Sequence, residues 1–138
     1  MISDWPSPAS IATAVARRLR RAKAHGERLD RLTLSGRGEP TLHPQFGDVV
    51  RRLRAVRDRH VPGTPLAVLS NASTASDPAV RAALCDLDER YMKLDAGDGG
   101  MLRRINGTRT SSDEIVSALS ELPDVVVQAM FVHDPAGF

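Results

Sequence analysis

The apolar residues of this chain follow two alternating patterns. Four segments have helical spacing, and a short further piece runs through Leu102 and Ile105. The defining residues are Ile11, Val15, Leu19 and Ala22; Val49, Val50, Leu53 and Val56; Val80, Ala83 and Leu84; and Ile115, Ala118, Leu119 and Leu122. Between the helical segments lie four runs of strand length, Arg31–Ser35, Pro65–Ser70, Arg90–Asp95 and Val125–Val132. The predicted order is a helix, three strand–helix units and a final strand.

Polar residues and glycines mark the ends of these helical segments. Ser7 and Asp77 each precede a proline, which is typical of the first turn of a helix. Ser111, with Glu114 three residues later, predicts a capping box for the last helix. Gly26 predicts the end of the first helix.

Strands joined by helices of this length pair in parallel through right-handed crossovers. Two architectures fit, an open doubly wound sheet or an arc of a β/α barrel. The helix at the start has no strand before it, and the last strand is followed by little chain, so the arc is favoured. We therefore expect an α/β fold: one incomplete domain over residues 1–138, a TIM-like partial barrel with about four parallel strands and helices outside. Its uncovered sheet face and edges predict marginal stability or self-association.

Composition narrows the class of protein. The chain has 138 residues, of which 41% are hydrophobic and 26% charged, as in a globular domain. It contains no apolar run of about 18 residues and no signal-like start, so we expect no membrane span and no secretion. Its single cysteine, Cys85, cannot form an internal disulfide, and the expected location is cytoplasmic.

The net charge of +2 conceals an asymmetry between the two parts of the chain. Residues 1–60 carry 13 Lys and Arg against 6 Asp and Glu, whereas residues 61–138 carry 6 against 11. Most of the positive excess lies in two arginine-rich runs, 17–23 and 51–59. No aromatic residues for stacking on bases interleave with these arginines, so we interpret the runs as solvated helix faces rather than a nucleic-acid surface.

Polar residues follow every predicted strand, at the positions where parallel α/β folds place their chemistry. These residues are Ser35, Gly36, Arg37, Gly38 and Glu39 after the first strand; Ser70, Asn71 and Ser73 after the second; Lys93, Asp95 and Asp98 at the third; and Gln128, His133 and Asp134 at the fourth. Lys93 and Asp95 are two positions apart and therefore share a face, opposite Met92 and Leu94. They form either a structural ion pair or a ligand site.

The turn SGRGEPTLHPQF (Ser35–Phe46) places a carboxylate between glycines and a proline. Gly36 and Gly38 permit unusual backbone angles and a close approach by a ligand, and Glu39 could hold a cation. The turn lacks the G-K-[ST] ending of a phosphate loop, and its carboxylate would repel phosphate. This argues against an unrelated doubly wound nucleotide-binding domain.

Four segments in this order, LTLSGRGEPTLHPQF, LAVLSNAS, YMKLDAGDGGMLRRIN and VVVQAMF, resemble the radical S-adenosylmethionine (radical SAM) enzymes, in particular a subgroup with a G-x-G-E-P-T-L-H-P turn. The resemblance covers roughly residues 30–133. It implies a partial barrel with S-adenosylmethionine across the strand ends and the methionyl ammonium held by the turn Gly36–Pro40. It also implies that Ser70 and Asn71 face the cofactor, that Lys93 and Asp95 contact its ribose or carboxylate, and that Gln128 points into the barrel.

One defining feature of that family is missing from this sequence. Its C-x3-C-x2-C motif, upstream of the turn, holds a [4Fe–4S] cluster that cleaves S-adenosylmethionine to a 5′-deoxyadenosyl radical. Cys85 alone cannot replace three thiolates, and we expect it to be a small buried residue in a helix. None of the four histidines has ligand spacing; His43, in the turn, either lines the site or is structural.

We therefore predict no catalytic or metal-binding residue in this chain. The first hypothesis is an inactive piece of a radical SAM core that retains the S-adenosylmethionine site. The second is a non-catalytic module that binds an adenosyl or nucleotide ligand, or associates through its sheet edges. The sequence does not identify a substrate.

Overall fold

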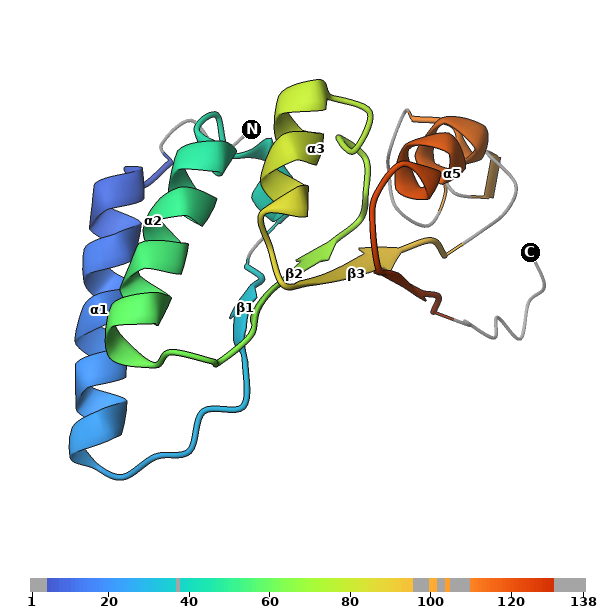
Figure 1. Cartoon of the computed structure of the whole chain (residues 1–138). Helices are drawn as coiled ribbons and strands as arrows, with labels where there is room; N and C mark the ends of the chain where they lie inside the picture. Colours follow the sequence, from blue (N-terminus) through green and yellow to red (C-terminus); the bar gives the residue numbers. More distant parts are fainter. Residues whose placement is uncertain (1–4, 37, 96–99, 102–103, 105–109, 131–138) are drawn as a thin grey trace.

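The computed structural model describes residues 5–36, 38–95, 100–101, 104 and 110–130. Within them the protein is an α/β fold in which helices pack on one four-stranded parallel sheet (Figure 1). The elements are α1 (Pro8–Ala24), β1 (Leu32–Leu34), the 3₁₀ helix η1 (Pro40–Leu42), α2 (Phe46–His60), β2 (Leu66–Ser70), α3 (Pro78–Cys85), β3 (Glu89–Lys93), α5 (Ser112–Ser120) and β4 (Val125–Gln128). This is the predicted order; the short piece through Leu102 and Ile105 lies outside the described residues.

The predicted helix caps are confirmed. The Ser7 hydroxyl accepts the Ser10 N–H at the start of α1, and the Asp77 carboxylate accepts two N–H groups at the start of α3. Ser111 and Glu114 form a reciprocal capping box on α5. Gly26 follows the end of α1 with a φ of 65°, a backbone conformation that favours glycine. Local sequence thus sets the ends of these helices.

Strand boundaries differ from the predictions because pairing between strands, not composition, sets them. β1 and β3 cover Leu32–Leu34 and Glu89–Lys93 instead of the predicted 31–35 and 90–95. β4 ends at Gln128, before the predicted end at Val132. There the Met130 N–H donates to the Asp95 carboxylate, so this backbone group has a side-chain partner instead of a strand partner.

The strands lie in chain order, β1-β2-β3-β4, and every neighbouring pair is parallel. The described strands show no reversal of order of the kind that marks the switch point of a doubly wound sheet. The labelled helices lie on one side of the sheet in Figure 1, as same-handed crossovers between successive neighbours require. The other face of the sheet carries no described helix.

The buried core lies between this sheet and the helices. Its sheet side comes from alternate residues, Leu66 and Val68 of β2 and Met92 of β3, each at most 2% exposed. Lys93 is on the opposite face from Met92, as predicted. The helix side comes from the apolar stripes of α2, α3 and α5, namely Phe46, Val49, Val50, Leu53, Ala83, Leu84, Ile115, Ala118 and Leu119. Burying these side chains is the main stabilising contribution to the fold.

Two buried arginines connect elements at the end of the sheet where the strands begin. Arg57 donates to the Thr64 carbonyl and to Asp88, whose carboxylate also accepts the Leu66 N–H. Arg90 donates to three backbone carbonyl oxygens, those of Leu84, Leu87 and Pro123. The arginine-rich run of α2 therefore contains one buried structural residue, Arg57. Others in that run form surface ion pairs, such as Arg52 with Asp48.

Cys85 is exposed, so the expectation that it is buried was wrong. It is the last residue of α3, and the buried side of that helix passes through Ala83 and Leu84 instead. A separate expectation concerned membranes. No helix in the described part of the chain is long and apolar enough to cross one.

Candidate functional site at the carboxyl ends of the strands

Four loops meet at the edge of the sheet where its parallel strands end. The turn Gly36–Pro40 follows β1, Asn71 follows β2, Asp95 follows β3, and Met130 follows β4. Hydrogen bonds join the first loop to the second and the third to the fourth. We call this edge the carboxyl rim.

The turn after β1 is tightly closed. The Gly38 N–H donates to the Gly36 carbonyl oxygen at 3.0 Å, and Gly38 has a φ of 116°, which side-chain-bearing residues rarely adopt. Gly36 has no such angle, and a Cβ added there would meet no atom within 4 Å. The backbone thus requires glycine at Gly38, whereas at Gly36 it only leaves open space. Arg37 lies outside the described residues.

The Glu39 side chain connects this turn to the end of β2. Its Oε1 atom accepts hydrogen bonds from the Thr41 N–H at 3.1 Å and from the Thr41 and Ser70 hydroxyls, each at 2.7 Å. Its Oε2 atom accepts the Asn71 N–H at 2.7 Å. The residue is only 9% exposed. Glu39 therefore fixes the loops, while Oε2, with one donor among the described residues, keeps capacity for another.

Because an ionised carboxylate only accepts, it also fixes the direction of the neighbouring hydroxyl groups. Thr41 and Ser70 must donate to Glu39, so the Thr74 hydroxyl donates to Thr41. The Ser70 oxygen is then free to accept the Ala72 N–H at 3.0 Å. Ala72 has a φ of 60°, a strained conformation for alanine. The network thus holds the loop after β2 in one backbone shape.

Lys93 and Asp95 form the second polar pair on the rim. The Lys93 Nζ atom lies 3.2 Å from Asp95 Oδ2, and Asp95 Oδ1 accepts the Met130 N–H at 2.9 Å. The Asp95 side chain is fully buried, and among the described residues Oδ2 has no hydrogen bond of good geometry despite its ion-pair distance to Lys93. A buried acceptor without a well-directed donor is costly. Because the carboxylate is fully buried, it holds Lys93 and the Met130 N–H in place and is not exposed to a ligand in this conformation.

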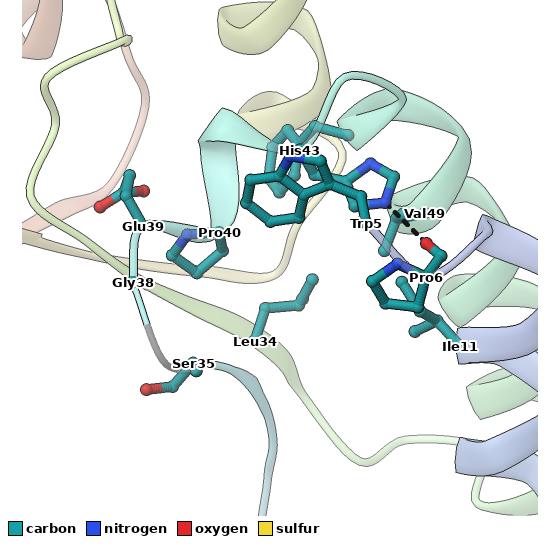
Figure 2. A pocket seen from close by; sticks show the side chains of 12 residues that line it. Trp5, Pro6, Ile11, Leu34, Ser35, Gly38, Glu39, Pro40, His43 and Val49 are labelled. Atoms are coloured by element: carbon teal, nitrogen blue, oxygen red, sulfur yellow. Dashed lines mark hydrogen bonds between the residues drawn. The ribbon is translucent and has the colours of Figure 1, made fainter. Parts of the chain in front are cut away.

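An apolar cavity of about 420 Å³ lies behind the turn, between β1, α1 and α2 (Figure 2). Leu34, Phe46 and Val49 line it together with Trp5, whose ring makes an edge contact with His43. In Figure 2 the Glu39 carboxylate points away from these rings. The cavity therefore borders the turn, with Gly36, Gly38 and Glu39 among its lining residues, but the Glu39 carboxylate does not point toward its aromatic lining.

His43 is structural. Its Nδ1 atom accepts the Gln45 N–H, so the proton lies on Nε2, which donates to the Pro6 carbonyl oxygen at 3.0 Å. The side chain is buried, and the bond ties the segment before α1 to the turn. Of the two interpretations offered by the sequence, the structural one fits these contacts.

The structure gathers the predicted site residues in two groups: Ser70 is in register with Met92 on the helix face of the sheet, and Lys93 is on the opposite face. Glu39, Ser70 and Asn71 are in direct contact, and Lys93 with Asp95 ends the neighbouring strand. The predicted rim residues Asp98, His133 and Asp134 lie outside the described residues. Sequence reasoning missed three participants, Thr41, Thr74 and the Met130 N–H. The Glu-Pro-Thr sequence, a helix N-cap followed by proline, was the one available signal for Thr41.

The described residues contain no group of three or more His, Cys, Asp or Glu side chains that could hold a metal ion. Cys85 ends α3, from which the chain passes directly into the start of β3. It therefore lies toward the end of the sheet opposite the carboxyl rim. This chain, with its single cysteine, does not supply the three thiolate ligands that an iron–sulfur cluster of this kind needs.

The described residues define an α/β protein with a group of polar side chains, a candidate site, at the ends of its parallel strands. Over 78 residues, 56% of the chain, it is 36% identical to the UPF0026 protein slr1464 of Synechocystis sp. and 31% identical to the UPF0026 proteins of two Helicobacter pylori strains. The match covers 28% and 24% of those relatives, so this chain spans about a quarter of their length. No protein-family model and no solved structure matches the chain.

Proposed function

We propose that this chain is part of a radical SAM enzyme core and binds S-adenosylmethionine at its carboxyl rim. The observation that carries the proposal is the hydrogen bond of the G-x-G-E-P turn to Asn71 after β2, with the Lys93–Asp95 pair at the end of the neighbouring parallel strand. Strand order and one-sided helices also support the finer fold proposal, an arc of a β/α barrel, because a barrel adds each strand beside the last.

The chemistry of the rim matches the polar groups of S-adenosylmethionine. The free capacity of Glu39 Oε2, with carbonyl oxygens of the turn, suits the methionyl ammonium. Open space beside Gly36 lets such a group approach the main chain. Ser70, which donates to Glu39, would act by holding the carboxylate in position rather than by direct contact.

Lys93 suits the carboxylate group of this ligand. The Lys93 side chain is 35% exposed, so its ammonium can reach a ligand carboxylate from its present position on the rim. The Asp95 side chain is fully buried, so it would act by holding Lys93 in position rather than by direct contact. In the absence of ligand the two side chains neutralise each other.

The cluster that would supply the electron in such an enzyme has no ligand set in this chain. A single exposed cysteine far from the rim cannot bind it, so we derive no chemical step. The chain alone is expected to bind S-adenosylmethionine without cleaving it. Formation of 5′-deoxyadenosine after reconstitution with iron, sulfide and a reductant would contradict this.

Calorimetric titration with S-adenosylmethionine tests the proposal. Lys93→Ala should weaken binding about tenfold, because it removes a charged hydrogen bond to the ligand. Lys23→Ala is a matched control, since Lys23 is the chain's other lysine and is exposed on α1. Absence of binding by the natural chain, or equal weakening by both variants, would refute the assigned site.

The second candidate function is a non-catalytic adenosyl- or nucleotide-binding module. It requires only the polar groups of the carboxyl rim and no cluster. Titration with adenosine and ATP separates the two candidates, because the module would bind them as tightly as S-adenosylmethionine. Preference for S-adenosylmethionine over adenosine supports the first candidate, since only the former carries the ammonium and carboxylate groups.

A further inference from the structure

The two buried carboxylates of the carboxyl rim differ in how their negative charge is matched. Asp95 has the Lys93 ammonium 3.2 Å away. Among the residues that the structure describes, no Lys, Arg or His forms an ion pair with Glu39, and its four hydrogen-bond donors are all uncharged groups. A buried charge is costly unless a counter-charge accompanies it. Glu39 therefore carries a charge that a cationic ligand can match.

The four donors are distributed unevenly over the two oxygen atoms of Glu39. Oε1 accepts the Thr41 N–H, the Thr41 hydroxyl and the Ser70 hydroxyl, whereas Oε2 accepts only the Asn71 N–H. A carboxylate oxygen offers about two lone-pair sites, so three donors fill Oε1, and a further donor from a ligand is directed to Oε2. Thr41 supplies two of the three donors at Oε1, and it is therefore the residue that contributes most to this asymmetry.

Thr41 is itself fixed by contacts with other loops. It lies in the 3₁₀ helix η1 and is 3% exposed. Its oxygen accepts the Thr74 hydroxyl, so its own hydrogen is directed to Glu39. Beside Thr74, the Ser73 carbonyl oxygen accepts the Thr110 hydroxyl at 3.1 Å. The loop after β2 and the segment before α5 thus hold the Thr41 hydroxyl in one direction.

We propose that Thr41 sets the preference of the carboxyl rim for a ligand that carries an ammonium group. Its hydroxyl holds Oε1, so the carboxylate is already oriented with Oε2 available to the ammonium. Without this hydroxyl the carboxylate would turn more freely, and a ligand would have to order it on binding. Because S-adenosylmethionine must occupy the rim, this role rests on the function proposed above. Thr41 is a positioning residue, since it acts through Glu39.

Titration with two ligands that differ only at the ammonium group tests this role. We compare S-adenosylmethionine with its deamino analogue, in which a hydrogen atom replaces that group. The natural chain should prefer S-adenosylmethionine about tenfold or more, since a charged hydrogen bond distinguishes the two ligands. Thr41→Val removes the hydroxyl and should lower this ratio at least about threefold, by weakening the binding of S-adenosylmethionine alone. Thr41→Ser keeps the hydroxyl and should keep the ratio.

Two control variants separate this role from a general effect on binding or folding. Lys93→Ala should weaken both ligands equally, because both carry the carboxylate group, and should leave the ratio unchanged. Thr13→Val makes the same substitution at an exposed threonine of α1 and should change neither dissociation constant. Circular dichroism verifies that every variant is folded. If Thr41→Val does not fold, Thr41→Cys replaces it, because a thiol is only a weak donor.

The possible results distinguish a failure of this inference from a failure of the proposed function. A ratio that Thr41→Val or Thr41→Cys leaves unchanged, equal weakening of both ligands, or a loss that Thr41→Ser shares would overturn the role of Thr41 and leave the S-adenosylmethionine site in place. Absence of S-adenosylmethionine binding by the natural chain would instead refute the proposed function, and the role of Thr41 with it.

Discussion

Glu39 is the residue on which the geometry of the carboxyl rim depends most. Its carboxylate accepts four hydrogen bonds from three residues, and those bonds define both the turn after β1 and the loop after β2. Charged acceptors of this kind contribute more than neutral ones. Glu39 therefore has a structural role, whatever ligand the rim binds.

Glu39→Gln should destabilise the fold by about 2 kcal/mol. The glutamine side-chain nitrogen only donates, so it would face the Asn71 N–H donor or, after a flip of the amide, the donors around Oε1. Urea denaturation of the variant and the natural chain measures this difference. Glu121→Gln, in an exposed ion pair with Arg81, is the control and should cost less than about 0.5 kcal/mol. Equal effects of the two substitutions would contradict the assigned role.

At the scale of single elements, the helices follow local sequence closely. Ser7, Asp77 and the Ser111–Glu114 box act within a few residues, so these caps could be predicted from the sequence. The strands were located for a similar reason, because each is a short apolar run. Their exact ends depend on the neighbouring strand, and for this reason β1, β3 and β4 differ from the prediction.

Other features could not be predicted because their partners lie far away in the sequence. Arg57 looked like one of several solvated arginines, but its partner Asp88 is 31 residues away. Glu39 was predicted to hold a cation, but its hydrogen-bond partners Ser70 and Asn71, 31 and 32 residues away, were not predicted. Cys85 was placed on a buried stripe, yet at the last turn of α3 that stripe passes through Ala83 and Leu84. The residue types showed which side chains can form hydrogen bonds and ion pairs, but only the fold shows which partners they have.

The capping box of α5 gives a prediction at this scale. Ser111→Ala removes the acceptor for the Glu114 N–H and should lower stability by about 1 kcal/mol. Ser117→Ala, in the middle of the same exposed helix surface, should be neutral or slightly stabilising because alanine favours helix. Thermal unfolding followed by circular dichroism compares the variants. A loss of stability in Ser117→Ala as large as in Ser111→Ala would exclude a capping effect.

At the scale of the whole molecule, the two ends of the sheet have different roles. The carboxyl rim carries the polar groups that suit a ligand. At the opposite end, Arg57, Asp88 and Arg90 join α2, the β-strands and the loops between them through hydrogen bonds to backbone groups. The same parallel topology thus separates the candidate site from the polar contacts that stabilise the fold.

Acid stability should depend on that opposite end. Burial acts to raise the pKa of Asp88, but the Leu66 N–H and the Arg57 guanidinium outweigh it, so the pKa lies below its ordinary value. A lowered folded-state pKa gives stability that is complete above the pKa of the unfolded chain, about 4, and is lost as pH falls through the folded value.

Asp88→Asn should therefore cost about 1 kcal/mol at pH 7, a modest figure because 42% of the Asp88 side chain is exposed to solvent screening. The difference from the natural chain should narrow below about pH 4. Urea denaturation at pH 7 and pH 3 measures both, with the exposed Asp30→Asn as control. A difference that stays constant with pH would show that the ionised carboxylate is not the cause.

The left-handed backbone conformation of Ala72 links this residue to Glu39 through Ser70. The strained conformation of Ala72 is stabilised by its bond to the Ser70 oxygen, and Ser70 is held by Glu39, so we expect substitutions at positions 39 and 72 to have non-additive effects on stability. In a protein with glycine at position 72, which adopts a positive φ without strain, loss of the Glu39 carboxylate should reduce stability less. In a protein with alanine at position 72, Glu39 should remain important for stability even when no ligand is bound.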